Sequence, residues 1–113
     1  MLAPAHRTRA EDIEATIAVI QANPQAASMV IEGCWGAAFH WIAYGTQQKH
    51  GKHQESHARL AMFARTLGEL DVADWWTLLD QVRQGGFYGS HADAAACQRA
   101  LELRDNIRIW ALS

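Results

Sequence analysis

Three residues in one stretch of the chain have side chains that could act together on a phosphate group: Arg83, Tyr88 and His91. Arginine offers phosphate a planar fork of donors, a tyrosine ring can stack on a base, and histidine exchanges protons near neutral pH. Metal-independent RNA cleavage needs a base for the 2′-hydroxyl, an acid for the leaving oxygen and a cation for the phosphorane. Arg83 and His91, doubled by dimer symmetry, could meet these needs. From the residues alone we favour a simpler interpretation, in which Arg83 caps helix carbonyls and His91 is exposed.

A second group of candidate residues is formed by His50, His53 and His57, with spacings of three and four residues. Two histidines at i and i+4 can share a metal ion. However, Gly51 separates the first two, which disfavours a continuous helix, and no carboxylate occupies the position expected in a His-Glu-x-x-His motif. We therefore predict a solvated histidine-rich loop and no metal site. His40 lies in the most apolar segment, where histidine is more often a core or interface residue than a ligand.

Motifs for other kinds of chemistry are missing. The glycine-rich residues 85–89 connect two predicted helices, whereas phosphate-binding loops connect a strand to a helix. There is no Gly-x-Ser-x-Gly motif, and we predict no cofactor. Cys34 and Cys97 lie among small and apolar residues without a Cys-x-x-Cys pair, which is typical of buried, reduced thiols.

Composition predicts a single all-α domain over residues 1–113. Half of the residues are hydrophobic, yet only 9% are aromatic, and the chain has just two prolines. Alanine supplies much of the apolar share and is the strongest helix former. The net charge of −2 provides no positive field for nucleic acid. Without a secretory apolar region or a membrane-length apolar segment, we expect a cytoplasmic protein that does not contact membranes.

Helix-capping residues divide the chain into five predicted helices. A capping box at Thr8 and Glu11 opens residues 8–22, and Asn23-Pro24 opens a helix that runs to about residue 48. Further helices are predicted over residues 54–67, from Asp71 to Gly85, and from a cap at Ser90 onward. Short connections between them predict an up-and-down bundle of four to five antiparallel helices.

The second predicted helix is apolar on nearly every side. Trp35 and Phe39 lie along one face, and Trp41 lies along another. A helix of this kind must be covered on every side, and one small monomer covers only part of it. We therefore predict a homodimer with Trp35, Phe39 and Trp41 at its interface. The alternative is a central helix that the other four helices cover within the monomer.

The order of the motifs resembles that of HEPN domains. The resemblance rests on residues 36–44 (GAAFHWIAY), on residues 52–65 with Ser56-His57, and on residues 78–83 followed by Phe87-Tyr88-Gly89. It covers about residues 26–111 and implies a bundle of four or five helices that is often homodimeric. Some members of the family are RNases of toxin–antitoxin and defence systems. Others bind nucleotides or partner a minimal nucleotidyltransferase.

The resemblance implies a functional site around Arg83, Tyr88 and His57. RNase members of the family carry an arginine and a histidine four to six residues apart, whereas seven residues separate Arg83 from His91 here. Phe87 also stands where those members carry aspartate. The expected function is therefore a nucleotide- or RNA-associated binding or accessory module, with a nucleotidyltransferase as a possible partner. The alternatives are a metal-independent endoribonuclease using Arg83 and His91, or an interaction protein that uses Trp75-Trp76 for assembly.

Overall fold

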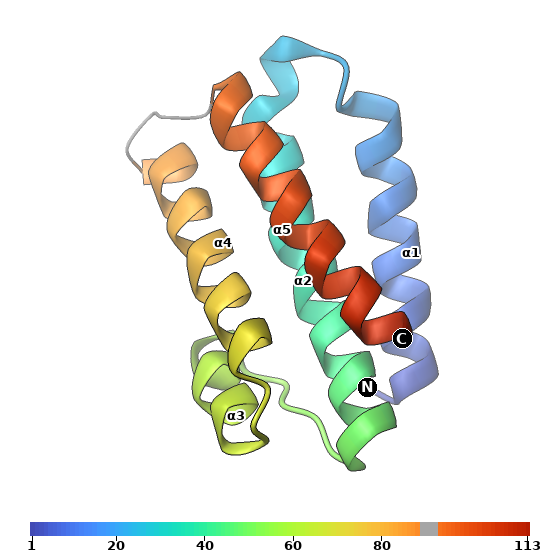
Figure 1. The fold of residues 1–113 in the computed structure, drawn as a ribbon. Coiled ribbons are helices and arrows are strands. Elements are labelled where there is room, and N and C mark those ends of the chain that lie inside the picture. Colours follow the sequence, from blue (N-terminus) through green and yellow to red (C-terminus); the bar gives the residue numbers. More distant parts are fainter. Residues whose placement is uncertain (89–92) are drawn as a thin grey trace.

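The computed structural model describes residues 1–88 and 93–113, which form an all-α bundle (Figure 1). Four long helices alternate in direction, and a short fifth helix lies at one end of the bundle. The predicted fold class is confirmed. The elements are α1 (Ala3–Ile20), η1 (Pro24–Ala26), α2 (Ala27–His50), η2 (His57–Arg59), α3 (Leu60–Thr66), α4 (Leu70–Tyr88) and α5 (Ala94–Leu112).

The first helix begins five residues before the predicted capping box. Pro4 lies in its first turn, where the missing N–H of proline costs no hydrogen bond. The Thr8 hydroxyl donates to the Pro4 carbonyl oxygen, 3.1 Å away. Thr8 therefore lies inside the helix and bonds to the backbone of the preceding turn. The prediction that Thr8 starts the helix was wrong because a threonine inside a helix can satisfy its hydroxyl in this way.

The other helix boundaries follow the sequence more closely. Asn23 accepts a hydrogen bond from the Gln25 N–H and caps η1, which leads directly into α2. Gly51 ends α2 with a φ of 74°, in the left-handed region that glycine adopts without strain. Asp93 caps α5 by accepting from the Ala96 N–H. The cap predicted at Ser90 lies outside the described residues.

The third predicted helix is the least accurate part of the prediction. Residues 54–56 are not helical, and the segment contains only the short turn η2 followed by the seven residues of α3. A left-handed Gly68, with a φ of 80°, ends this segment as predicted. The next helix, α4, begins at Leu70 and continues through Gly85 to Tyr88. Two adjacent glycines lower helix propensity without excluding a helix.

The apolar helix α2 is the centre of the bundle and packs against α1, α4 and α5. Phe39 is 4% exposed and Trp41 is 2% exposed within this single chain. The dimer interface predicted at these two residues is therefore corrected, because the monomer already covers them. Trp76, half of the pair expected to serve assembly, is also buried in the core. The alternative of a central helix describes α2.

A single buried cluster joins residues from all five helices. Small residues allow close approach: Gly33 of α2 receives the side chain of Ile17, and Gly45 receives Trp110 of α5. Glu14 of α1 and Arg104 of α5 form an ion pair with side chains only 18% and 12% exposed. Within the described residues, no helix is both long and apolar enough to span a membrane.

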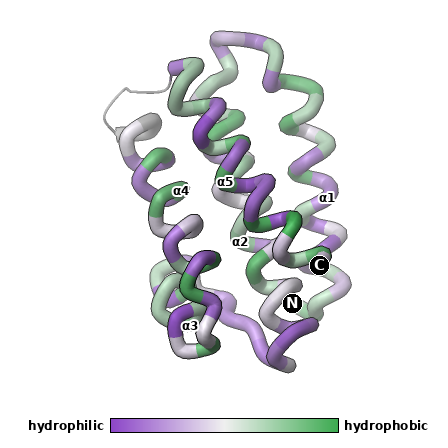
Figure 2. Tube along the Cα trace, viewed as in Figure 1, coloured by the Kyte–Doolittle hydropathy of each residue, from purple (hydrophilic) through white to green (hydrophobic). Residues whose placement is uncertain are grey.

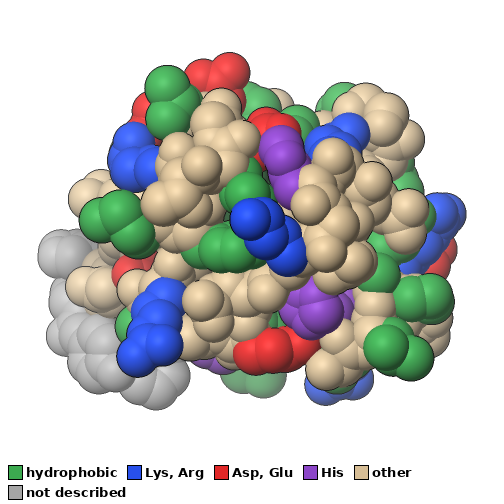
Figure 3. All heavy atoms as spheres, turned by 90° about the horizontal axis from the view of Figure 1, so that it is seen from below, with side chains coloured by type: hydrophobic (Ala, Val, Ile, Leu, Met, Phe, Trp, Pro, Cys, Tyr) green, Lys and Arg blue, Asp and Glu red, His purple; other side chains and the backbone are tan. Residues whose placement is uncertain are grey.

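Hydrophilic residues dominate the segment that connects α2 to η2, at the lower end of the bundle (Figure 2). Seen from this end, histidine, acidic and basic side chains lie close to one another, with hydrophobic groups between them (Figure 3).

Candidate functional site

A cavity of about 290 Å³ lies where α2, η2 and α4 meet. The residues that line it are Trp35, His57, Ala58, Asp80 and Arg83. They are brought together from three separate parts of the sequence. The packing of α4 on α2 places Trp35 beside Asp80 and Arg83, and the turn η2 adds His57.

Arg83 is held in a defined position within this cavity. Its guanidinium carbon lies 4.2 Å from the centroid of the Trp35 ring, a cation–π contact. Its Nε donates to Asp80 Oδ1 at 3.4 Å, and its Nη1 lies 3.7 Å from Glu32 Oε1. The side chain is 20% exposed. The guanidinium group of Arg83 is therefore oriented by one aromatic ring and two carboxylates, and it remains partly exposed to solvent.

His57 also packs against Trp35, the ring that Arg83 contacts. Its ring meets Trp35 edge-on, with 4.5 Å between centroids, and meets Phe39 at 4.2 Å. Desolvation against these rings, together with the positive charge of Arg83, lowers the pKa of His57 below its ordinary value. His57 is therefore neutral at neutral pH, with one ring nitrogen able to donate and the other able to accept.

Asp80 connects the parts of the site. Its Oδ1 accepts from the indole N–H of Trp35 at 3.0 Å, and its Oδ2 accepts from the amide of Gln84 at 2.9 Å. Asp80 therefore fixes the ring plane on which Arg83 lies. Trp35 is further supported by stacking on Trp76, with 5.4 Å between ring centroids.

The structure brings together two of the four residues predicted to form the functional site. Arg83 and His57 line one cavity. His91 and the side chain of Tyr88 lie outside the described residues, and so their predicted roles stay predictions. Trp35 also lines this cavity, and its predicted place at a dimer interface stays a prediction.

A second cluster of polar residues lies on the other side of Phe39. His6 is 0% exposed, and its Nδ1 lies 2.8 Å from Nδ1 of His40. Burial and the neighbouring His6 lower the pKa of His40 to about 4. Burial also lowers the pKa of His6. A hydrogen bond from the terminal ammonium lowers the pKa of Glu55 to about 2.

Two features of these sites were missed by the analysis of the sequence. Ala3, His6, Ala10, Ile13 and Ile17 are spaced three and four residues apart, and this seam shows that His6 faces the core. This spacing could have identified His6 as a core residue, but the first helix was predicted to begin only at residue 8, which left His6 outside it. The role of Asp80 had no such signal, because a carboxylate within a helix is common on protein surfaces.

No protein-family model, curated protein or solved structure matches this chain.

Proposed function

We propose that this protein is a binding module for a nucleotide or for a phosphorylated RNA end. The observation that carries the proposal is the cavity in which Arg83, stacked on Trp35, lies beside His57. These groups provide a planar cation, an aromatic ring and a neutral hydrogen-bonding ring within one opening. Recognition of nucleotides uses this combination of groups.

Phosphate would bind at the guanidinium of Arg83. Both of its carboxylate contacts are long, at 3.4 and 3.7 Å, and Glu32 is 41% exposed. A phosphate group can accept two parallel hydrogen bonds from an arginine, which is stronger recognition than either of these contacts provides. Glu32 can move into solvent when phosphate enters. Asp80 and Trp35 would keep the guanidinium plane oriented.

The size and charge of the site favour a small ligand over extended RNA. The cavity of about 290 Å³ lies at the lower limit of typical ligand pockets, roughly 300–1,000 Å³. Asp80 and Glu32 flank the arginine, and the whole chain carries a net charge of −2. Long RNA needs a line of cations along its backbone. A mononucleotide or a single RNA end needs one cation and one stacking surface.

An accessory role for the module, as a homodimer or with a nucleotidyltransferase, is part of the proposal and rests on the resemblance to HEPN domains. With Phe39 and Trp41 buried, a dimer would need a different surface. The groove between α1 and α2 is one such surface, lined by Ile13, Ile20, Met29, Gly33 and Gly36 among others. Light scattering after size exclusion measures the assembly directly, and a monomer at high micromolar concentration would contradict the dimer.

Binding can be tested with a thermal-shift and calorimetric panel of nucleoside mono-, di- and triphosphates and short RNAs with 5′- or 3′-phosphates. We expect saturable binding of at least one phosphorylated ligand, weakened at least about tenfold by Arg83→Gln. Arg65→Gln is the matched control, since Arg65 is a half-exposed arginine paired with Asp74 on the surface. Equal loss in both variants, or no binding to any ligand, would contradict the proposal. The second result would favour a bundle that serves protein interactions only.

One observation favours a second candidate function, RNA cleavage without a metal ion. A neutral His57 shares the cavity with Arg83, so a proton acceptor and a cation face the same space. The expected pairing of Arg83 with His91 stays a prediction beside this one, because His91 lies outside the described residues. Incubation with RNA in EDTA tests it: cleavage should be lost in both Arg83→Gln and His57→Gln. Cleavage lost in Arg83→Gln and His91→Gln but kept in His57→Gln would instead support the pair predicted from the sequence.

A further inference from the structure

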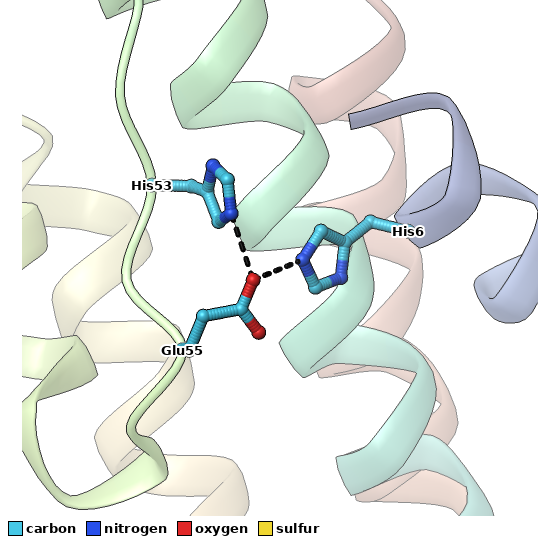
Figure 4. A group of neighbouring side chains, drawn as sticks. All are labelled: His6, His53 and Glu55. Atoms are coloured by element: carbon cyan, nitrogen blue, oxygen red, sulfur yellow. Dashed lines mark hydrogen bonds and ion pairs between the residues drawn. The ribbon is translucent and has the colours of Figure 1, made fainter. Parts of the chain in front are cut away.

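Two histidine rings converge on one carboxylate oxygen of Glu55, between the start of α1 and the segment that follows α2 (Figure 4). His53 Nε2 lies 2.8 Å from Glu55 Oε1, and His6 Nε2 lies 3.1 Å from the same atom. The terminal ammonium of Met1 also reaches it, at 3.0 Å. The two ring nitrogens and the carboxylate oxygen all lie within 4.8 Å of one another.

The hydrogen bond at Nδ1 of His53 determines whether its other ring nitrogen, Nε2, carries a hydrogen or a lone pair. Its Nδ1 lies 2.8 Å from the amide oxygen of Gln47, which only accepts. His53 therefore carries its hydrogen on Nδ1, and in the neutral ring Nε2 presents a lone pair. That lone pair faces a carboxylate oxygen at 2.8 Å. Two acceptors at this distance need a cation between them, which is either a second proton on the ring or a metal ion.

His6 has the same arrangement on its side of the cluster. It is fully buried, and its Nδ1 lies 2.8 Å from Nδ1 of His40. When His6 donates to His40 through this nitrogen, its Nε2 is also a lone pair directed at Glu55. Metal-binding histidines nearly always donate their other N–H to a neighbouring acceptor, which fixes the ring and raises its basicity. Gln47 and His40 are in position to serve as these acceptors.

We propose that His6, His53 and Glu55 form a zinc site. Two imidazoles and one carboxylate are a ligand set that Zn²⁺ takes in proteins, whereas Mg²⁺ and Ca²⁺ prefer oxygen ligands alone. Three protein ligands leave a fourth position open to water or to another small ligand. The ion takes the place of the Met1 ammonium as the cation at Glu55.

Two of the three separations between ligand atoms need only a small movement to fit zinc. Zinc bonds of roughly 2.0–2.1 Å in a tetrahedral site separate ligand atoms by about 3.3 Å, slightly more than the present 2.8 and 3.1 Å. Glu55 is 51% exposed and can turn outward, while His6 is fixed by the core. Because His53 and Glu55 precede His57 in the chain, a bound ion would tie the segment that leads to the cavity onto α1.

The test is calorimetry with Zn²⁺ on the full chain after chelator treatment, together with the visible spectrum of the Co²⁺ form. We expect one ion per chain and the intense visible bands of a four-coordinate site. His53→Gln and Glu55→Gln should each weaken binding at least about 100-fold, and Gln47→Ala about tenfold. His53 is 20% exposed and Glu55 51%, so these two variants should fold, which far-UV circular dichroism checks.

His50→Gln is the matched control, because His50 lies in the same region but pairs with Glu69 at 2.9 Å. It should bind zinc as the wild-type chain does. No binding of Zn²⁺ by the wild-type chain would overturn the proposal and leave a proton as the cation between His53 and Glu55. Unchanged binding in His53→Gln, or equal loss in His50→Gln, would overturn it as well, because both results point to scattered surface histidines.

Discussion

The ring of Trp110 lies directly against the backbone of α2 at Gly45. A β-carbon at Gly45 would overlap Cζ3 of the indole and lie 2.7 Å from Cη2 and 3.1 Å from the Cα atom of Ala111. The indole N–H is anchored by Glu69 Oε2, 2.9 Å away. The ring cannot simply rotate away from α2, because that movement would break this hydrogen bond. The absence of a side chain at residue 45 therefore allows α2 and α5 to approach closely.

Gly45→Ala should lower the free energy of unfolding. Although alanine favours a helix by about 1 kcal/mol over glycine, overpacking against a fixed ring costs roughly 1–3 kcal/mol, and the new β-carbon would also press on the backbone at Ala111. Chemical denaturation measures the change. Gly36→Ala on the same helix is the control: its nearest contact would be Ile13 Cδ1 at 3.6 Å, ordinary van der Waals distance. This control should be neutral or slightly stabilising, and equal destabilisation by both variants would refute the explanation.

Glu14→Gln should destabilise the protein by roughly 3 kcal/mol, since it leaves the largely buried charge of Arg104 without its main partner. Arg104 keeps one contact, with Asp105 at 2.9 Å, so the loss is substantial but incomplete. Equilibrium unfolding in urea tests this. Asp74→Asn, which breaks the exposed pair between Asp74 and Arg65, should change stability by less than about 0.5 kcal/mol. A similar effect of both substitutions would show that burial does not distinguish the two pairs.

Cys34 should resist alkylation in the native protein. Burial raises the pKa of its thiol from the ordinary 9.0 to about 12, so at pH 8 the reactive thiolate is about a thousandfold rarer than in an exposed cysteine. Iodoacetamide labelling read by mass spectrometry should modify Cys97, which is partly exposed, long before Cys34. In denaturant the two cysteines should react alike. Rapid native labelling of Cys34 would contradict its place in the core.

Arg83→Lys should weaken binding of a phosphorylated ligand nearly as much as Arg83→Gln does. Lysine keeps the charge but loses the planar fork and the stacking on Trp35, which lies 4.2 Å from the guanidinium carbon. Titration calorimetry with the ligand found in the nucleotide panel measures both variants. If lysine restored full affinity, the site would use only a point charge, and the role given to Trp35 would be wrong.

Local signals in the sequence located those helix boundaries at which one capping residue acts on the backbone next to it. Asn23, Gly51 and Gly68 each satisfy or release backbone groups at their own position, so their effect can be inferred from the sequence alone. The prediction failed at residues 54–56, where the chain is not helical. There His53 and Glu55 contact His6 from the other end of the sequence, an interaction that no local pattern reports.

The sequence by itself determined that this protein is a helical bundle, because alanine content, capping residues and the spacing of apolar positions act within one helix or one turn. Only the tertiary structure decided how the aromatic and polar residues are used. Phe39 and Trp41 became core residues rather than interface residues because α1, α4 and α5 cover α2. Arg83 lies beside His57, and His6 lies beside His53, because the packing of the helices brings together residues that are far apart in the sequence.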